Sequence, residues 1–206
     1  MNQAGQWKPA VKRVNVDERE RLKRGKALLR QKDYNEALTE FKAILENNPK
    51  SINALLGIGL IYLKQEQLDE ALPWLRQAKS LDPLQPKPYF LEGMVLSQQG
   101  DLEGAEQAFR AALAIDPRLN RALIGLGEVL LSRQRYDEAL AQCEAARYNP
   151  QQTAARLLIA KIYVEQHKIN EAITEIRTVL EIDPSQIRAY LLPSAPVHGG
   201  LVIKES

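Results

Sequence analysis

The chain of 206 residues contains few of the side chains from which disulfide, metal and catalytic sites are built. It has one cysteine, Cys143, and two histidines, His167 and His198. A single cysteine excludes an intramolecular disulfide, and two histidines without suitable spacing do not form a zinc site. We therefore expect no metal and no cofactor.

Long apolar runs and phosphate-binding glycine loops are also missing. No segment approaches the ~20 apolar residues that span a bilayer, and residues 1–16 lack the apolar stretch of a signal peptide. Neither Gly-x-x-x-x-Gly-Lys-Ser/Thr nor Gly-x-Gly-x-x-Gly after a strand occurs. These absences favour a cytoplasmic protein that is not an enzyme and has no transmembrane segment. A chain that lacks its natural leader would have the same composition.

What the chain does contain is a regular spacing of proline. Pro49, Pro83 and Pro117 are 34 residues apart, Pro150 follows after 33 residues and Pro184 after a further 34. A fixed period of this length is typical of stacked-repeat proteins. The shorter step before Pro150 predicts a second helix or loop that is one residue shorter in that repeat.

Each period carries small and large residues at equivalent positions. A Gly or Ala is followed three residues later by a large apolar residue, and nine residues after that by alanine. Small residues let two antiparallel helices approach closely while large ones fill the remaining space. Asp-Pro pairs such as Asp82-Pro83 end the second helices, because a residue before proline is disfavoured in the α region. Each period therefore predicts helix, short turn, helix. The alanines are Ala37, Ala71, Ala105, Ala139 and Ala172.

This pattern resembles the tetratricopeptide repeat. The resemblance implies an all-α fold, a right-handed α-α superhelical solenoid of about five helix-turn-helix repeats. It covers about four fifths of the chain and is weaker in the first and fifth repeats, where Arg21 and Arg156 hold the position of the consensus tryptophan. We also expect a bacterial origin. The repeats are placed at residues 18–51, 52–85, 86–119, 120–152 and 153–186.

The segments outside the repeats are expected to differ from them. Residues 1–17 predict a basic leader that is disordered alone, and residues 187–206 an incomplete sixth repeat with an extended tail. Residues 187–192 read like the opening of a helix, which Pro193 and Pro196 stop. Either the tail covers the apolar end of the solenoid, through residues 201–203, or another chain does, which would give a homo-oligomer. A truncated sequence is the third alternative.

The resemblance also implies a binding site, because the first helices of tetratricopeptide arrays line a concave groove. We predict a peptide-binding groove with an apolar floor and a basic rim, which suits an amphipathic helix of a partner protein. Alternatively, several of these apolar side chains are buried between adjacent helices. The predicted residues are Asn53, Leu56, Leu60, Leu63, Lys64, Lys87, Phe90, Met94, Arg121, Ile124, Glu128 and Leu131.

One type of ligand is excluded by side-chain chemistry. Family members that bind the C-terminal carboxylates of heat-shock chaperones use a Lys/Asn/Arg clamp at positions that here hold Leu56, Leu60, Phe90 and Met94. Apolar side chains cannot pair with a carboxylate. We therefore expect a non-catalytic protein–protein interaction scaffold or assembly factor of a different specificity.

A second hypothesis rests on the uneven distribution of charge. Residues 1–30 carry nine basic and three acidic side chains, although the whole chain has a net charge of only +2. Such a segment could act as an adaptor to nucleic acid or to an anionic membrane surface, and place the protein at the periphery of a membrane complex. Trp7 is the only aromatic residue before Tyr34, which argues against nucleic acid.

Overall fold

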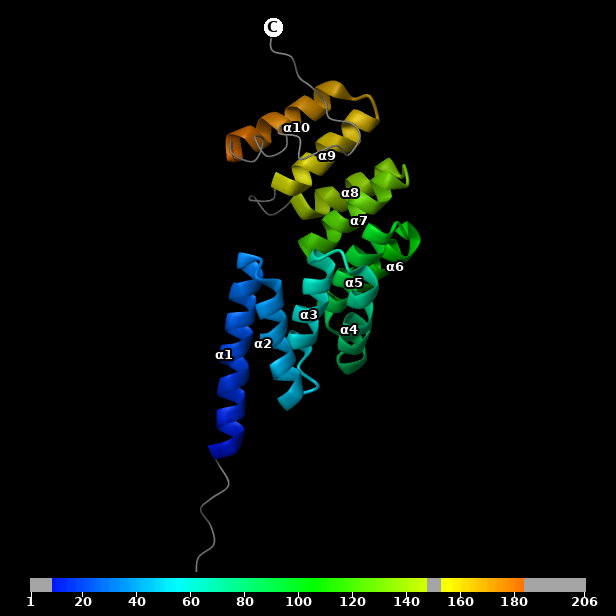
Figure 1. Cartoon of the computed structure of the whole chain (residues 1–206). Coiled ribbons are helices and arrows are strands. Elements are labelled where there is room, and N and C mark those ends of the chain that lie inside the picture. Colours follow the sequence, from blue (N-terminus) through cyan, green and yellow to red (C-terminus); the bar gives the residue numbers. More distant parts are fainter. Residues whose placement is uncertain (1–8, 148–152, 184–206) are drawn as a thin grey trace, which may run out of the picture. The chain divides into compact units, whose positions relative to one another are not determined.

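The computed structural model describes residues 9–147 and 153–183, and these ranges contain ten α-helices and no β-strand (Figure 1). The all-α prediction is therefore confirmed. The helices are α1 (Pro9–Gln31), α2 (Tyr34–Asn47), α3 (Ile52–Lys64), α4 (Leu68–Leu81), α5 (Pro86–Gln99), α6 (Leu102–Ile115), α7 (Asn120–Ser132), α8 (Tyr136–Arg147), α9 (Thr153–Glu165) and α10 (Ile169–Ile182).

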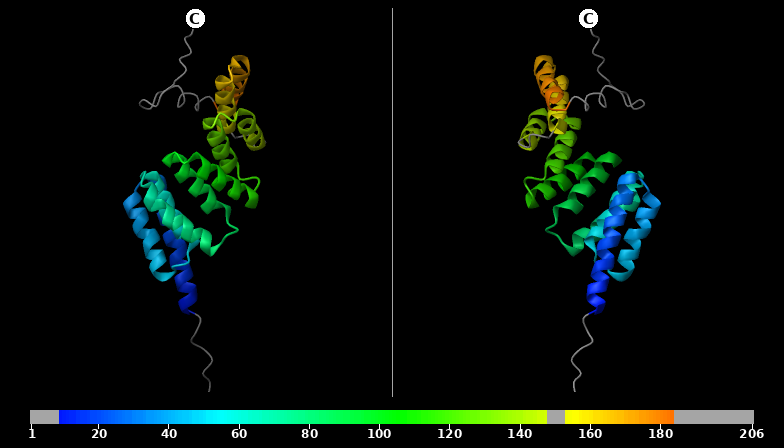
Figure 2. Two further views of the ribbon diagram at one scale, coloured as in Figure 1. Left: turned by 90° about the vertical axis from the view of Figure 1, so that its right-hand side faces the viewer. Right: turned by 90° about the vertical axis from the view of Figure 1, so that its left-hand side faces the viewer.

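The helices belong to two compact units. The first extends from Met1 to Pro117 and holds α1 to α6, and the second extends from Arg118 to Ser206 and holds α7 to α10. In both units each odd-numbered helix packs against the even-numbered helix that follows it (Figures 1 and 2). In the first unit α1 also contacts α3, and α3 contacts α5. In the second unit α7 contacts α9. The first helices of successive repeats are therefore neighbours within each unit.

Four of the first helices begin where the sequence places the start of a repeat, at Ile52, Pro86, Asn120 and Thr153. The first repeat differs, because α1 begins at Pro9 and so includes residues 9–17 of the predicted disordered leader. Proline is favoured at the first position of a helix, where its missing N–H is not needed and its fixed φ suits the helix. Residues 1–8 and the predicted sixth repeat and tail at 187–206 lie outside the described residues, as does the end of the fourth repeat at 148–152.

The turn within each hairpin has the same backbone conformation in all five repeats. One residue has a positive φ between 59° and 82°, and only in the third repeat, at Gly100, is it glycine. The following residue donates its N–H to the carbonyl five positions earlier, as Asp33 does to Leu28 at 2.9 Å and Lys168 to Tyr163 at 2.8 Å. This bond closes the C-terminus of the first helix. The left-handed residues are Lys32, Glu66, Gly100, Gln134 and His167.

The core lies between the helices of each hairpin and between adjacent hairpins. The five repeat alanines are at most 2% exposed, as expected for positions where two helices approach closely. In the first two repeats Phe41 of α2 is the largest member of a buried cluster that includes residues of α3, and Trp74 packs against the cluster from outside. Neighbouring repeats of the first unit therefore share one core. The cluster consists of Ala37, Phe41, Ile44, Ala54, Ile58 and Ile61.

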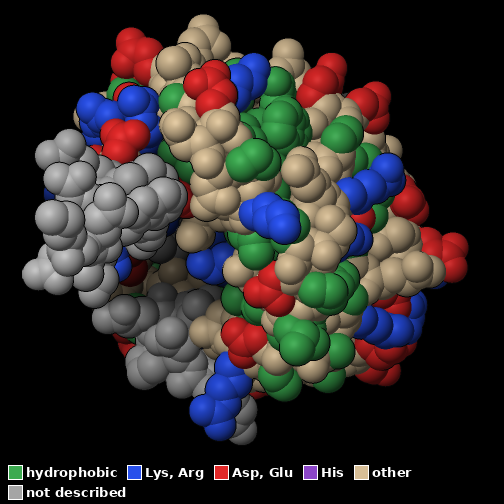
Figure 3. Space-filling model, turned by 90° about the horizontal axis from the view of Figure 1, so that it is seen from below, with side chains coloured by type: hydrophobic (Ala, Val, Ile, Leu, Met, Phe, Trp, Pro, Cys, Tyr) green, Lys and Arg blue, Asp and Glu red, His purple; other side chains and the backbone are tan. Residues whose placement is uncertain are grey.

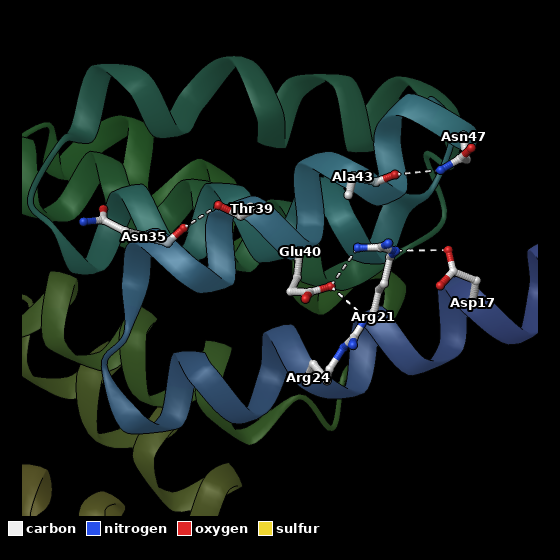
Figure 4. Close-up of polar contacts among 8 residues, drawn as sticks. All are labelled: Asp17, Arg21, Arg24, Asn35, Thr39, Glu40, Ala43 and Asn47. Atoms are coloured by element: carbon white, nitrogen blue, oxygen red, sulfur yellow. Dashed lines mark hydrogen bonds and ion pairs between the residues drawn. The ribbon is translucent and has the colours of Figure 1, made fainter.

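The two repeats with arginine at the consensus tryptophan position satisfy its charge in the same way. Arg21 Nη1 lies 3.1 Å from Glu40 Oε2, and Arg156 Nη1 lies 2.9 Å from Glu175 Oε2 (Figure 4 shows the first pair). In both pairs the glutamate lies 19 residues after the arginine, on the second helix of the same hairpin. A part-buried ion pair thus replaces apolar packing at this position in the first and fifth repeats.

Breaking one of these pairs is expected to be more harmful than removing it. Arg156→Leu alone should lower the free energy of unfolding by about 1–2 kcal/mol, because the Glu175 carboxylate, 12% exposed, loses this partner. Arg156→Leu combined with Glu175→Gln copies Leu123 and Gln142 of the fourth repeat and should restore stability to within about 0.5 kcal/mol. Urea unfolding measures both, and a single variant as stable as the double variant would contradict the expectation.

Candidate protein-interaction surface

The predicted groove residues divide between the two units. Eight of them lie on α3 and α5 of the first unit, and the other four lie on α7 of the second. On α3, Leu56, Leu60 and Leu63 follow one another at helical spacing and share a face. Leu60 is half-buried, whereas Leu56 is 8% and Leu63 is 2% exposed. Asn53 and Lys64, at either end of this row, are exposed.

On α5 the same positions combine a buried ring with a more accessible thioether. Phe90 is 6% exposed because its ring packs against that of Phe109 on α6, with 6.0 Å between the centroids and 43° between the planes. Met94, one turn further along α5, is half-buried, and Lys87 is exposed. Phe90 is therefore mainly a core residue, while Met94 contributes to the surface.

The two alternatives raised from the sequence thus apply to different residues of the same row. Leu56, Leu63, Phe90 and Leu131 are each at most 8% exposed and fill space between helices. The apolar side chains that retain exposed area are Leu60 and Met94 in the first unit and Ile124 in the second. Half-buried apolar residues between exposed polar ones are the kind that a partner can cover further.

Helix α1 adds basic residues that the predicted groove did not include. Lys26 and Arg30 are exposed, and they occupy in the first repeat the positions that Leu60 and Lys64 occupy in the second. Lys26, Arg30, Lys64 and Lys87 make no ion pair within the described part of the chain. The repeat alignment was the signal that could have found Lys26 and Arg30. The basic segment and the apolar row therefore lie on neighbouring helices of one unit.

Acidic residues of α1 are engaged elsewhere. Asp17 pairs with Arg21 at 3.0 Å (Figure 4). Glu18 accepts hydrogen bonds from the side chains of Asn48, at 3.1 Å, and Ser51, at 2.6 Å, and so ties α1 to the connection between α2 and α3. Two of the three carboxylates near the start of α1 are thus occupied, which leaves the exposed surface of α1 predominantly basic.

In the second unit the predicted residues carry charges of both signs. Arg121 and Glu128 of α7 are exposed, and Lys161 lies on the neighbouring helix α9. Partial burial of its carboxyl raises the pKa of Glu128, and the charge of Lys161 opposes this shift. The first helices of this unit therefore lack the uniform positive charge found in the first unit.

The described residues give little support for catalysis or metal binding. Cys143 is fully buried, and burial raises the pKa of its thiol to about 12, so that the nucleophilic thiolate is suppressed at neutral pH. Across residues 9–147 and 153–183, no three His, Cys, Asp or Glu side chains are grouped as a metal site requires. No helix in the described part is both long and apolar enough to cross a membrane. Figure 3 shows one face of the molecule, on which apolar side chains lie among Lys and Arg.

Repeated helical hairpins with small residues at their contacts define a tetratricopeptide-repeat protein. The chain belongs to the family described as the Cilia and flagella-associated protein 70 C-terminal domain, which matches residues 6–186. Proteins of this fold generally mediate protein–protein interaction and assembly, and they are typically non-catalytic scaffolds. The resemblance found in the sequence is thereby confirmed.

Individual proteins agree with this assignment. Anaphase-promoting complex subunit 3 of Schizosaccharomyces pombe is 24% identical over 152 residues, which cover 73% of this chain but only 23% of that protein. The crystal structure of TTC0263, a thermophilic TPR protein of Thermus thermophilus, is 24% identical with a TM-score of 0.73, covering 83% of this chain and 94% of that one. YrrB, described as a TPR protein with an unusual peptide-binding site, is 20% identical with a TM-score of 0.61, covering 82% and 88%.

These proteins support the fold and leave the biology open. The chain spans about a quarter of the length of its yeast relative. The proteins come from a eukaryote and from a bacterium, so the expected bacterial origin stays a prediction.

Proposed function

We propose that the chain is a non-catalytic scaffold that binds an acidic amphipathic helix of a partner protein along α1, α3 and α5. The observation that carries this proposal is the combination of half-buried Leu60 and Met94 with the cations Lys26, Lys64 and Lys87, which make no ion pair within the described residues. A helix with one apolar face and acidic edges complements both features. The peptide-binding site ascribed to YrrB is compatible with this mode of binding.

The two kinds of contact contribute differently. Covering the remaining exposed area of Leu60 and Met94 supplies affinity in proportion to the apolar area removed from water, at about 25 cal/mol per Å². Met94 can adjust its shape to different partners. Exposed cations contribute about 0–1 kcal/mol each and act mainly on association rate and on the choice between partners. We therefore expect affinity that falls moderately with salt.

The proposal is tested with two fluorescently labelled helical peptides of about 16 residues that share a Leu face and differ in having Glu or Lys elsewhere. The acidic peptide should bind and the basic one should not. Lys64→Glu with Lys87→Glu should weaken binding of the acidic peptide about tenfold, since two attractive charges become repulsive. Fluorescence anisotropy measures the dissociation constants.

A matched control makes the same change of net charge elsewhere. Lys42 and Arg76 are exposed on the second helices α2 and α4, so Lys42→Glu with Arg76→Glu should alter affinity less than about twofold. If both double variants weaken binding equally, the effect is one of net charge, and the proposed surface is wrong.

The alternative adaptor function is decided by the same samples. Single-stranded RNA and vesicles containing phosphatidylserine serve as probes for the basic surface of α1. Binding to either that exceeds binding to the acidic peptide and decreases steeply with salt would replace the proposed function. The described residues of α1 beyond Val16 include no aromatic side chain on which bases could stack, which favours the peptide.

A further inference from the structure

Helix α10 carries an apolar face that its counterparts in other repeats do not expose. Ile169, Ile173 and Leu180 lie at helical spacing and are 48%, 38% and 41% exposed. The residues aligned with Ile169 and Ile173 in α2, α4 and α8 are all half-buried. These counterparts are Tyr34, Leu68 and Tyr136, and Leu38, Leu72 and Leu140.

The difference has a physical cause in the stacking of repeats. Phe41 and Ile44 of α2 share a buried cluster with Ala54 and Ile58 of α3, the first helix of the next repeat, and Leu38 packs against this cluster. The second helix of one repeat is thus covered by the first helix of the next. The described residues end at Asp183, one position after α10, so they include no helix in that place for α10.

We propose that residues 187–192 of this chain form the first turns of a sixth repeat and pack on the exposed face of α10. The spacing supports this assignment, because α2 ends at Asn47 and α3 begins at Ile52, and α4 ends at Leu81 and α5 begins at Pro86. The same interval of five positions leads from the end of α10 at Ile182 to Ile187. Covalent attachment also gives this segment a high effective concentration at α10.

The side chains of the segment match the interface that they would enter. Ala189 is aligned with Ala54, Ala122 and Ala155, each of which is 0% exposed in its own repeat. Leu191 is aligned with three large apolar residues that are at most 8% exposed. These are Leu56, Phe90 and Leu157.

Pro193 limits how much of α10 this segment covers. Six helical residues extend about 9 Å, whereas the 14 residues of α10 extend about 21 Å. A short connection makes the two helices antiparallel neighbours, so the segment begins beside the C-terminal end of α10. It therefore covers Ile176 and Leu180, and leaves Ile169 and Ile173 accessible.

The test compares two identical substitutions in the full chain. Ala189→Asp places a carboxylate in the proposed interface, and Ala195→Asp places one beyond Pro193. Hydrogen exchange measured by mass spectrometry should show about tenfold faster exchange of the amides of residues 176–182 in Ala189→Asp, and unchanged rates in Ala195→Asp. Unchanged exchange in α1 to α6 of both variants serves as the control for folding.

Three results would overturn the proposal. The first is equal exchange of α10 in both variants. The second is protection of α10 that rises with protein concentration, which would mean that a second copy covers the face. The third is faster exchange caused by Leu201→Asp but not by Ala189→Asp, which would assign the contact to the tail at residues 201–203.

Discussion

Replacing Phe41 with alanine is expected to lower the free energy of unfolding of the first two repeats by about 3–5 kcal/mol. The Phe41 side chain is 1% exposed and is the largest member of the cluster shared by α2 and α3. Its removal eliminates the transfer free energy of the ring and leaves a cavity that helices held by several other contacts cannot close. Because the cluster joins two repeats, we expect the effect to reach both.

Trp74 provides a local measurement of this effect, since it packs against the same cluster. Urea unfolding followed by both tryptophan fluorescence and circular dichroism should show the transition shifted to lower urea concentration. Leu84→Ala is the control, because Leu84 is 79% exposed and its truncation should change stability by less than about 0.5 kcal/mol. A Phe41→Ala transition as close to wild type as that of Leu84→Ala would show that the cluster is not a core.

The second large effect is expected from adding atoms to the same place. A Cβ at Gly57 would lie 2.7 Å from both Cε2 and Cζ of Phe41, and a Cβ at Gly25 would lie 2.9 Å from Cε1 and Cζ. The ring is thus held between two glycines from the first helices of successive repeats and cannot move away from either. Gly57→Val should destabilise the protein by about 3 kcal/mol, since overpacking outweighs the few tenths gained in helix propensity.

A double-mutant cycle separates this clash from any backbone effect of losing glycine. Phe41→Leu makes room at the ring position, so Gly57→Val should cost at least about 1 kcal/mol less in that background than in the wild type. The same urea titration measures all four proteins. Strictly additive costs would mean that the Phe41 ring does not oppose a side chain at residue 57.

The repeat architecture was predictable because its determinants are local and recur. Proline removes one backbone donor and restricts the residue before it wherever it occurs, so Asp82-Pro83 and Asp116-Pro117 mark helix ends without knowledge of the fold. Asp82 and Asp116, whose ψ angles are 91° and 93°, indeed leave the helical region directly before these prolines. Alanine at every thirty-fourth position likewise indicates a close helix contact, because no larger side chain fits there.

The binding surface was less predictable, because exposure depends on neighbours that are distant in the sequence. Leu60 and Phe90 occupy neighbouring positions of the same repeat pattern, yet only Phe90 meets an aromatic ring, that of Phe109, and is buried. Arg21 and Arg156 were read as isolated charges in packing positions, since their glutamate partners lie 19 residues away on another helix. Nothing in the local pattern of either segment reports the pairing.

By itself the amino-acid sequence determined the number and the limits of the hairpins, since proline, alanine and glycine act through backbone geometry and van der Waals volume wherever the chain places them. Only the tertiary structure decided which side chains remain accessible, which charges are paired and which face of α10 is open. Burial and charge pairing depend on the approach of different helices, and a period of 34 residues carries no information about the atoms that meet across them.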